Sequence, residues 1–518
     1  MLNRLVGFPI HYYLHLLGCV IVIVGLMTSK SAMSIGSIWL IANLVLEGRF
    51  KTYWKNLKKE PVIALIALFF LLHFIGLLWT ENIAEGIKDI RIKLPLLVLP
   101  LVLVSKPINR TNTFYMLALF TACAFLVSLI NFFMYHFASH SDFRSITLFG
   151  SHIRLGLMIV FATFLSLYHF YHTKNTLRFL SLISFIWLTF YTLFSQVVSA
   201  NVILILLLIF LLFYKISALK NQPLQWFYSL LVLLVLIGSS FFLISIVTPD
   251  VEPVDSTSLE EKTAKGNRYR HYPEHELKEN GHHIYLYICD KELRKAWNKR
   301  STLNYDSLNS EEESIKSTLV RYMASKGLRK DAEGFEQLSS SDIKNIEEGL
   351  STVRALEPFY FKRLEDLKME IYSFQKGTSR SGYSFLQRLE YWNAALHLIN
   401  NDFWFGVGTG DVPLAMNHAY NEINSPILEK YRNKPHNQFL SVWVGLGVFG
   451  FVFFTLIWFY FLRKSFYKKN LICIVFGLII ILSFIPEDTI QTQQGVTFAS
   501  FFLGLFLCSF LNDSKTSA

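Results

Sequence analysis

The sequence contains few cysteines, and their positions exclude a disulfide framework. Of the five, Cys19, Cys123, Cys473 and Cys508 lie inside long apolar runs, which leaves Cys289 alone in a polar stretch. A disulfide needs two thiols within reach of each other, so none can form inside that stretch. The histidines between 271 and 283 match no strong zinc pattern, and a solvated polar loop explains them better than a metal site does.

Charged residues are also few, at 17% of the chain, and their distribution argues against a nucleic-acid partner. The formal net charge is +11. Residues 249–437 hold 26 basic and 29 acidic side chains, a net of −3, whereas the remainder holds 23 and 9, a net of +14. The positive excess therefore lies in the loops between apolar runs and not on one basic face, so no nucleic acid is expected to bind.

Long apolar runs are abundant, and they predict a membrane protein. Hydrophobic residues make up 52% of the chain, and a helix that crosses a bilayer needs roughly 20 mostly apolar residues. About twelve such runs occur, near 7–27, 31–47, 61–79, 92–105, 114–138, 151–170, 178–194, 198–216, 225–248, 438–462, 471–486 and 495–511. The first lacks a small-residue cleavage site, which favours a retained helix over a removed signal peptide. The predicted fold class is an all-α polytopic membrane protein.

The short loops predict the orientation, because cytoplasmic loops accumulate lysine and arginine. With the N-terminus inside, 17 basic residues lie on the cytoplasmic side and 6 on the other. Three regions follow: a membrane domain of nine helices at 1–248, a periplasmic domain at 249–437, and three helices with a short cytoplasmic tail at 438–518. The expected location is the bacterial inner membrane, with the periplasmic domain between helices nine and ten.

The periplasmic domain is expected to be mainly helical. Apolar residues recur with helical spacing at 315–322, at 343–350 after a candidate N-cap at Asp342, and along 383–398. No alternating strand pattern stands out. The basic run Arg294–Arg300 indicates an exposed helix face more than a phosphate-binding site.

A His-Asn pair stands at the predicted outer mouth of the tenth helix. His436 and Asn437 precede the apolar run, and glycines follow at 445, 447 and 450. Histidine exchanges protons readily near neutral pH, and the glycines would let a neighbouring helix or a lipid chain approach closely. From the residues alone, an interfacial histidine that caps the helix is an equally good interpretation.

This segment resembles the signature of the O-antigen ligase family. His436, Asn437, Gly447 and Gly450 occupy the signature positions. Upstream, a helix over 388–396 with an arginine and aromatic residues, followed by a Gly-x-Gly-x-Gly turn, is similar to a further part of the family pattern. Polysaccharide polymerases and protein O-oligosaccharyltransferases share much of this pattern. One departure is that 195–201 lacks the Ser-Arg pair of many relatives.

The resemblance implies a donor, an acceptor and residue roles. The donor would be an undecaprenyl-pyrophosphate-linked glycan, and the acceptor a glycolipid such as lipid A-core, both bound from the membrane. Arg154, Arg388 and Arg91 would hold the donor pyrophosphate, which suits the bidentate guanidinium fork. His436 would act as the general base on the acceptor hydroxyl or would position that hydroxyl, with Asn437 holding the imidazole or the substrate. Neither a metal nor another cofactor is implied.

Further residues near the predicted outer face are candidates for supporting roles. His152 opens the sixth run beside Arg154, while Lys93, near Arg91, is a weaker candidate. Glu487 and Asp488 could orient His436 or an acceptor hydroxyl, although an exposed acidic loop is the simpler interpretation.

The turn formed by Gly406, Gly408 and Gly410 lacks the βαβ context of a nucleotide site. A tight turn whose amides could face an anion explains it better.

Two rival functions remain open at the level of the sequence. A polymerase would use the same donor with a growing lipid-linked chain as the acceptor. A non-enzymatic glycolipid transporter would need charged residues at mid-span positions along a pore. Apart from Arg154, near one end, the apolar runs are almost free of charge, which favours an enzyme that works at one face of the membrane.

Overall fold

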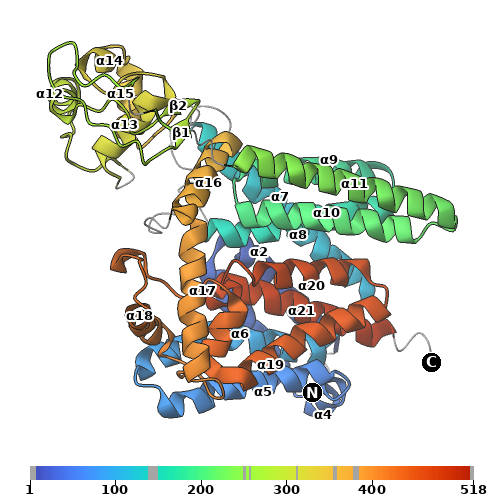
Figure 1. Cartoon of the computed structure of the whole chain (residues 1–518). Coiled ribbons are helices and arrows are strands. Elements are labelled where there is room, and N and C mark those ends of the chain that lie inside the picture. The colour runs from blue at the N-terminus through green and yellow to red at the C-terminus, as the bar shows by residue number, and fades with distance from the viewer. Residues whose placement is uncertain are drawn as a thin grey trace. The chain divides into compact units, whose positions relative to one another are not determined.

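The computed structural model describes residues 8–137, 147, 150–248, 253–255, 258–310, 313–353, 359–376 and 384–513. In these ranges almost all regular structure is helical (Figure 1). The exception is one antiparallel hairpin of two-residue strands, β1 and β2. The predicted all-α class is therefore confirmed.

The elements follow one another along the chain in an order that begins and ends with apolar helices. They are α2 (Phe8–Thr28), α3 (Lys30–Glu47), α4 (Phe50–Leu57), α5 (Pro61–Ile75), η1 (Gly76–Trp79), α6 (Ile83–Ser105), α7 (Arg110–Phe137), α8 (His152–His172), α9 (Asn175–Phe194), α10 (Val198–Ser217), α11 (Gln222–Val247), β1 (Lys278–Glu279), β2 (His282–His283), α12 (Asp290–Arg300), α13 (Ile315–Ser325), α14 (Ala332–Glu336), α15 (Ser340–Glu347), α16 (Phe359–Gln375), α17 (Ser384–Asn401), α18 (Val412–Glu422), η5 (Glu429–Tyr431), α19 (Gln438–Tyr467), α20 (Leu471–Ser483), η6 (Thr489–Gln491) and α21 (Gln493–Asp513).

Each of the twelve predicted apolar runs coincides with a helix, but fewer of them qualify as membrane spans. Among the described residues, eight helices are long and apolar enough to cross a bilayer, or nine if α3 and α4, which are bent by 120°, form one span. The helices α20 and α21 are apolar but shorter, and the first half of α6 carries five charged side chains between Glu85 and Lys93. The chain is a multi-pass membrane protein, and the predicted number of twelve spans is not confirmed.

The chain divides into two compact units, and the larger consists of 1–218 and 388–518. Its most buried span is α8, which packs against α7, α9, α10 and α20, while α21 packs along α6. Aromatic side chains fill this core. Phe161 of α8 contacts Phe120, Phe476 and Phe502 with ring centroids 5.0–5.7 Å apart. Because α8 is held on several sides, the residues at its N-terminal end have a well-supported position.

The second unit, residues 219–387, has its own hydrophobic core. Trp297 of α12 and Tyr322 of α13 are fully buried in it. The basic run of α12 is exposed, as predicted, with Arg294 paired to Asp306 at 2.7 Å. The sequence suggested Asp342 as the N-cap of α15, and this prediction is wrong. Ser339 is the cap, and Asp342 completes a capping box from the third helical position. The predicted domain boundaries at 248 and 437 depend on membrane orientation and stay a prediction.

Candidate functional site

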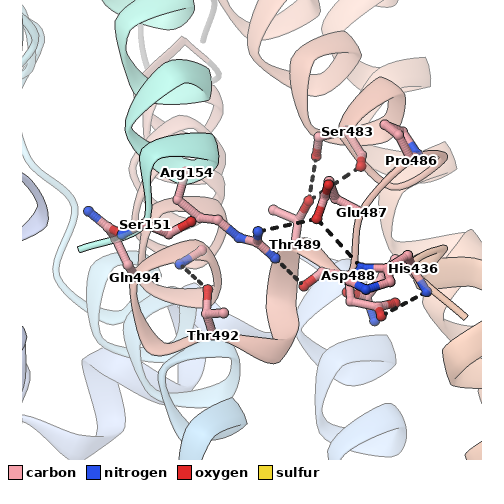
Figure 2. A network of polar contacts seen from close by, with 12 residues as sticks. Ser151, Arg154, His436, Ser483, Pro486, Glu487, Asp488, Thr489, Thr492 and Gln494 are labelled. Carbon is pink, nitrogen blue, oxygen red and sulfur yellow. Dashed lines mark hydrogen bonds and ion pairs between the residues drawn. The ribbon is translucent and has the colours of Figure 1, made fainter. Parts of the chain in front are cut away.

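The loop between α20 and α21 is fixed at several points in the larger unit. The hydroxyls of Ser483 and Thr489 lie 2.9 Å apart at its start. The N–H of Ile490 donates to Oε1 of Gln438 at 2.9 Å. At its far end, Oε1 of Gln494 accepts from the N–H of Ser151 at 3.2 Å. Glu487 and Asp488 lie between these anchored points (Figure 2).

Three basic side chains from distant parts of the sequence converge on Glu487. Nη1 of Arg154, in the first turn of α8, lies 3.3 Å from Oε2. Nη2 of Arg388, in α17, lies 3.1 Å from Oε1. Nδ1 of His436 lies 3.8 Å from Oε2, an ion-pair distance and not a hydrogen bond. Figure 2 shows Arg154 and His436 approaching the carboxylate from opposite sides. Hereafter the site cluster means Arg154, Arg388, His436, Glu487 and Asp488.

The electrostatic environment keeps Glu487 ionised. Only 4% of this residue is exposed, and such burial alone would raise the pKa of its carboxyl. The contact with His436 and the charges of Arg154 and Arg388 more than offset burial, so the pKa of Glu487 lies below its ordinary value. In return, one carboxylate allows two guanidinium groups to lie close together despite their repulsion.

The cations also bond to the backbone of the same loop. Nη2 of Arg154 donates to the carbonyl oxygen of Asp488 at 2.9 Å, and Nε of Arg388 donates to that of Pro486 at 3.3 Å. Nε of Arg154 is buried and has no hydrogen-bond partner among the described residues. The two arginines are thus oriented by the loop, and Arg154 retains one N–H that the protein does not use.

Asp488 fixes the turn that carries His436. Its Oδ2 accepts from the N–H of His436 at 3.2 Å, and its Oδ1 accepts from the hydroxyl of Ser441 at 2.6 Å. Burial raises the pKa of this carboxyl above its ordinary value. His436 has a positive φ of 48°, a conformation that non-glycine residues seldom adopt and that needs support from its surroundings.

The simpler interpretation of the acidic pair, an exposed loop, is wrong. Glu487 and Asp488 are 4% and 6% exposed. Hydrophobicity patterns could not reveal this, because each carboxylate is buried by partners that lie far away in the sequence.

Asn437, and not His436, caps α19. The Oδ1 of Asn437 accepts from the N–H groups of Phe439 and Leu440 at 3.0 and 3.1 Å, which satisfies two free amides of the first turn. This finding removes the interpretation of His436 as a helix cap. The histidine ring lies instead beside Tyr391 of α17, with ring centroids 5.7 Å apart, and its side chain is 32% exposed.

The glycine turn at 406–410 lies between α17 and α18. The sequence suggested that its amides could face an anion, but the structure shows that they do not. The N–H groups of Val407 and Gly408 donate to the carbonyl oxygens of Val444 and Gly445 at 2.8 and 3.1 Å. The N–H groups of Gly406, Thr409 and Gly410 donate to Asp402, Gly76 and Thr80 respectively. All five amides therefore have partners inside the protein.

The turn fits into a break in α19. Gly447 has φ 63° and ψ −167°, which interrupts the helix. A Cβ on Gly447 would lie 2.1 Å from the carbonyl oxygen of Trp404, and one on Gly406 would lie 2.5 Å from that of Val444. The close neighbour of Gly447 is the loop backbone at Trp404 and Phe405, and not the helix or lipid chain that the sequence predicted. Position 447 therefore requires glycine for both conformation and space.

Other candidates lie outside the site cluster. Arg91 is exposed on α6, and no ion pair or hydrogen bond joins it to the cluster in the part of the chain that the structure describes. His152 is the first residue of α8, two positions before Arg154. Lys93 is buried and paired with Asp89 at 2.5 Å, so its charge is already balanced.

A pocket with both polar and apolar lining adjoins the cluster through Ser441, which bonds to Asp488. Its lining includes His73, Lys93, Lys434 and Gln491, all in the larger unit. Sequence analysis missed His73 and Ser441. The sequence pattern could have identified Ser441. Gln438, Ser441 and Gly445 are polar or small residues that lie on one face of the otherwise apolar α19.

The comparison with known families agrees with the resemblance stated above. Residues 350–455 match the family model described as O-antigen ligase. This family consists of membrane glycosyltransferases of the ligase and polymerase type, and the matched segment contains Arg388 and His436 but not Arg154 or Glu487. A search of the curated proteins finds no match.

Proposed function

We propose that this protein transfers a glycan from an undecaprenyl-pyrophosphate donor to lipid A-core or a similar glycolipid acceptor at the periplasmic face of the bacterial inner membrane. The observation that carries this proposal is the convergence of Arg154, Arg388 and His436 on Glu487. Two of these three residues, Arg388 and His436, lie in the segment that matches the O-antigen ligase family. The third comes from a helix more than 200 positions earlier in the chain.

The arginines would stabilise the leaving group. As the bond between the anomeric carbon and the pyrophosphate oxygen breaks, negative charge grows on the lipid pyrophosphate. Fixed cations at that point lower the barrier. The side chain of Arg388 is 30% exposed, so it can bind phosphate oxygens at the surface of the cluster. The Nε–H of Arg154 has no partner among the described residues but is buried, so a phosphate oxygen would have to enter the cluster to reach it. Arg91, which lies outside the cluster, would act only on a more distant part of the donor.

His436 would accept the proton of the acceptor hydroxyl as its oxygen attacks the anomeric carbon. Glu487 lies near Nδ1, which leaves Nε2 for this proton transfer, and the carboxylate would balance the positive charge that the ring gains as it accepts the proton. One displacement of this kind inverts the anomeric configuration. Asn437, Asp488 and Ser441 would act indirectly by fixing the turn that carries the histidine.

The proposed reaction uses neither a metal nor a cofactor, because the lipid pyrophosphate already activates the sugar. Among the described residues no group of three metal-ligating side chains occurs. Purified protein should transfer glycan at an unchanged rate in the presence of EDTA. A loss of activity that added divalent metal restores would contradict this part of the proposal.

The nearest alternative is a polymerase, with a glycolipid transporter as a more distant one. Profiling lipid-linked intermediates and finished surface glycan in a deletion strain distinguishes the three. A strain without a ligase accumulates polymerised glycan on the lipid carrier. A strain without a polymerase retains single repeat units, and loss of a transporter leaves those units on the cytoplasmic side. Only the first result supports the proposal.

The proposed orientation places residues 249–437 outside the cytoplasm. In a background without other cysteines, Ser310→Cys should react with a membrane-impermeant thiol reagent in intact spheroplasts, because Ser310 is exposed and lies in the proposed periplasmic region. Ser217→Cys, exposed at the end of α10, should react only after lysis. The reverse pattern would place the site on the cytoplasmic face.

Arg154→Ala and Arg388→Ala should raise the apparent KM for the donor and lower turnover, because a phosphate partner acts in both the ground and the transition state. Lysine at either position should restore only part of the activity, since it lacks the bidentate fork. Glycan transfer and donor-lipid binding are measured at matched protein levels. Arg432→Ala is the control, because Arg432 lies in the same matched segment and bonds to Asn421. Unchanged donor binding in both site variants would exclude the assigned role.

A further inference from the structure

A cavity lies at the bend between α3 and α4, far along the sequence from the site cluster. Gly48, with φ 68°, ends α3, and the two helices meet at 120°. The cavity has a volume of about 470 Å³, in the range of about 300–1,000 Å³ typical of small-molecule sites. Its lining comes from α3, α4 and α6 and is mostly apolar: Leu44, Phe50, Tyr53, Trp54, Leu57, Leu101, Val102 and Ser105.

The helix α4 is amphipathic, and its apolar face lines this cavity. Phe50, Tyr53, Trp54 and Leu57 are spaced so that they share one face. Lys51, Lys55 and Lys58 lie along the adjoining face, and all three are exposed. Short helices with aromatic residues on one face and lysines on the other are typical of the membrane interface.

Tryptophan and lysine lie together at the edge of this surface. Trp54 is 62% exposed although it lines the cavity, and the Lys58 amine lies 5.2 Å from its ring centroid. Exposed tryptophan is favoured at headgroup depth, where an apolar ring and a polar edge are both accommodated.

Contacts with neighbouring helices hold α4 in place without using its lysines. Nδ2 of Asn56 donates to the carbonyl oxygen of Ser105 at 3.0 Å. Glu47 accepts from the Tyr53 hydroxyl at 2.7 Å and pairs with Lys106, so the charge of Lys106 is already balanced. Lys51, Lys55 and Lys58 are exposed on α4 and at its end, Lys59 follows them, and Arg49 shares Glu47 with Lys106.

We propose that this cavity and the lysine row of α4 bind an anionic phospholipid of the surrounding bilayer. An acyl chain would occupy the apolar cavity, and the phosphate would lie among Lys51, Lys55 and Lys58. Charge complementarity selects this occupant, because an apolar cavity alone would accept any acyl chain, whereas three exposed lysines favour an anionic headgroup. The inference does not depend on the proposed glycan transfer.

The test titrates purified full-length protein in detergent with phosphatidylglycerol or with phosphatidylcholine and measures bound lipid by native mass spectrometry. The variant K51Q/K55Q/K58Q should bind phosphatidylglycerol about 10- to 100-fold more weakly, since each lysine near an anionic headgroup contributes about 1 kcal/mol. Its binding of phosphatidylcholine should change little. Val102→Trp, which places a larger side chain at the buried cavity wall, should weaken binding of both lipids.

The control is K291Q/K295Q/K299Q, which removes an equal charge from exposed positions of α12. It should bind both lipids as the wild type does. Unchanged phosphatidylglycerol binding by K51Q/K55Q/K58Q would overturn the proposal, as would an equal loss in the control, because either result would show that the lysines of α4 form no specific site.

Discussion

His436→Ala is expected to reduce the rate of glycan transfer by about 10²–10⁴-fold, the usual cost of removing a general acid or base. Folding and donor binding should remain close to wild type, because Arg154 and Arg388 still pair with Glu487 and Asn437 caps α19 without the histidine. The measurement is the initial rate of transfer in vitro, with donor-lipid binding determined separately at matched protein levels.

His397→Ala provides a closely matched control. His397 lies in the same family segment, pairs with Glu422 at 2.8 Å and has a side chain 34% exposed, against 32% for His436. Both variants therefore remove a partly exposed histidine beside a carboxylate. A wild-type rate in His436→Ala, or an equal loss in His397→Ala, would show that the assigned base is wrong.

Glu487→Gln is expected to lower the free energy of unfolding by about 3–5 kcal/mol, because removing one partner of a buried ion pair leaves the other uncompensated. The side chains of Glu487 and Arg154 are 6% and 10% exposed, so solvent screens the pair little. Transfer should fall as well, since His436 loses the carboxylate near Nδ1 and the two guanidinium groups lose the anion between them. Stability is measured by denaturant titration in detergent, and transfer by the same in vitro assay.

The effect on stability should depend on pH with a definite sign. The pKa of Glu487 is lowered in the folded protein, so its contribution is fully present above the ordinary glutamic acid pKa of about 4.3 and is lost as the pH falls through the lower folded value. In the Glu487→Gln variant, stability should no longer fall at acidic pH through protonation of this residue. An identical acid dependence in wild type and variant would mean that Glu487 is not held ionised by its partners.

A second buried ion pair separates loss of folding from loss of chemistry. Glu60 is 2% exposed and accepts from Lys464 at 2.7 and 2.6 Å through its two oxygens. Glu60 precedes the first residue of α5. At the opposite end of that helix, the hydroxyl of Thr409, in the glycine turn, donates to the carbonyl oxygen of His73 at 2.8 Å. Glu60→Gln should also lower stability, because it leaves Lys464 without its carboxylate, although burial raises the pKa of Glu60 and lessens what its charge contributes. It should spare transfer by the folded fraction. If Glu60→Gln and Glu487→Gln lost transfer equally, Glu487 would contribute to folding alone and not to the reaction.

The sequence predicts the helices well because apolar length is a local property. The runs near 7–27 and 151–170 became α2 and α8 with bounds within two residues. It could not predict how many helices span the membrane, since α6 combines an apolar second half with charges such as Asp89 and Lys93 that are neutralised only by pairing within the folded protein.

The candidate site was predicted in part. Arg154, Arg388 and His436 stand out because each departs from its surroundings or fits a family pattern, and the structure brings them together. Glu487 was undervalued because its burial is produced by residues 333 and 99 positions away. Asn437 was predicted to hold the imidazole or the substrate. An asparagine before an apolar helix is also a normal N-cap, and the two hydrogen bonds that its Oδ1 accepts are those of an N-cap.

Several side-chain contacts in the larger unit connect parts of the chain that are synthesised far apart in time. Glu81 and Asp411 are separated by 330 positions, Arg154 and Glu487 by 333, and Ile108 and Cys508 by 400. A nascent chain must therefore insert its early helices and hold Arg154 without its carboxylate until the last hundred residues have emerged. A chain terminated before Glu487 would retain most of its apolar helices yet carry an unbalanced arginine near its core, so incomplete copies should be unstable targets for proteolytic quality control.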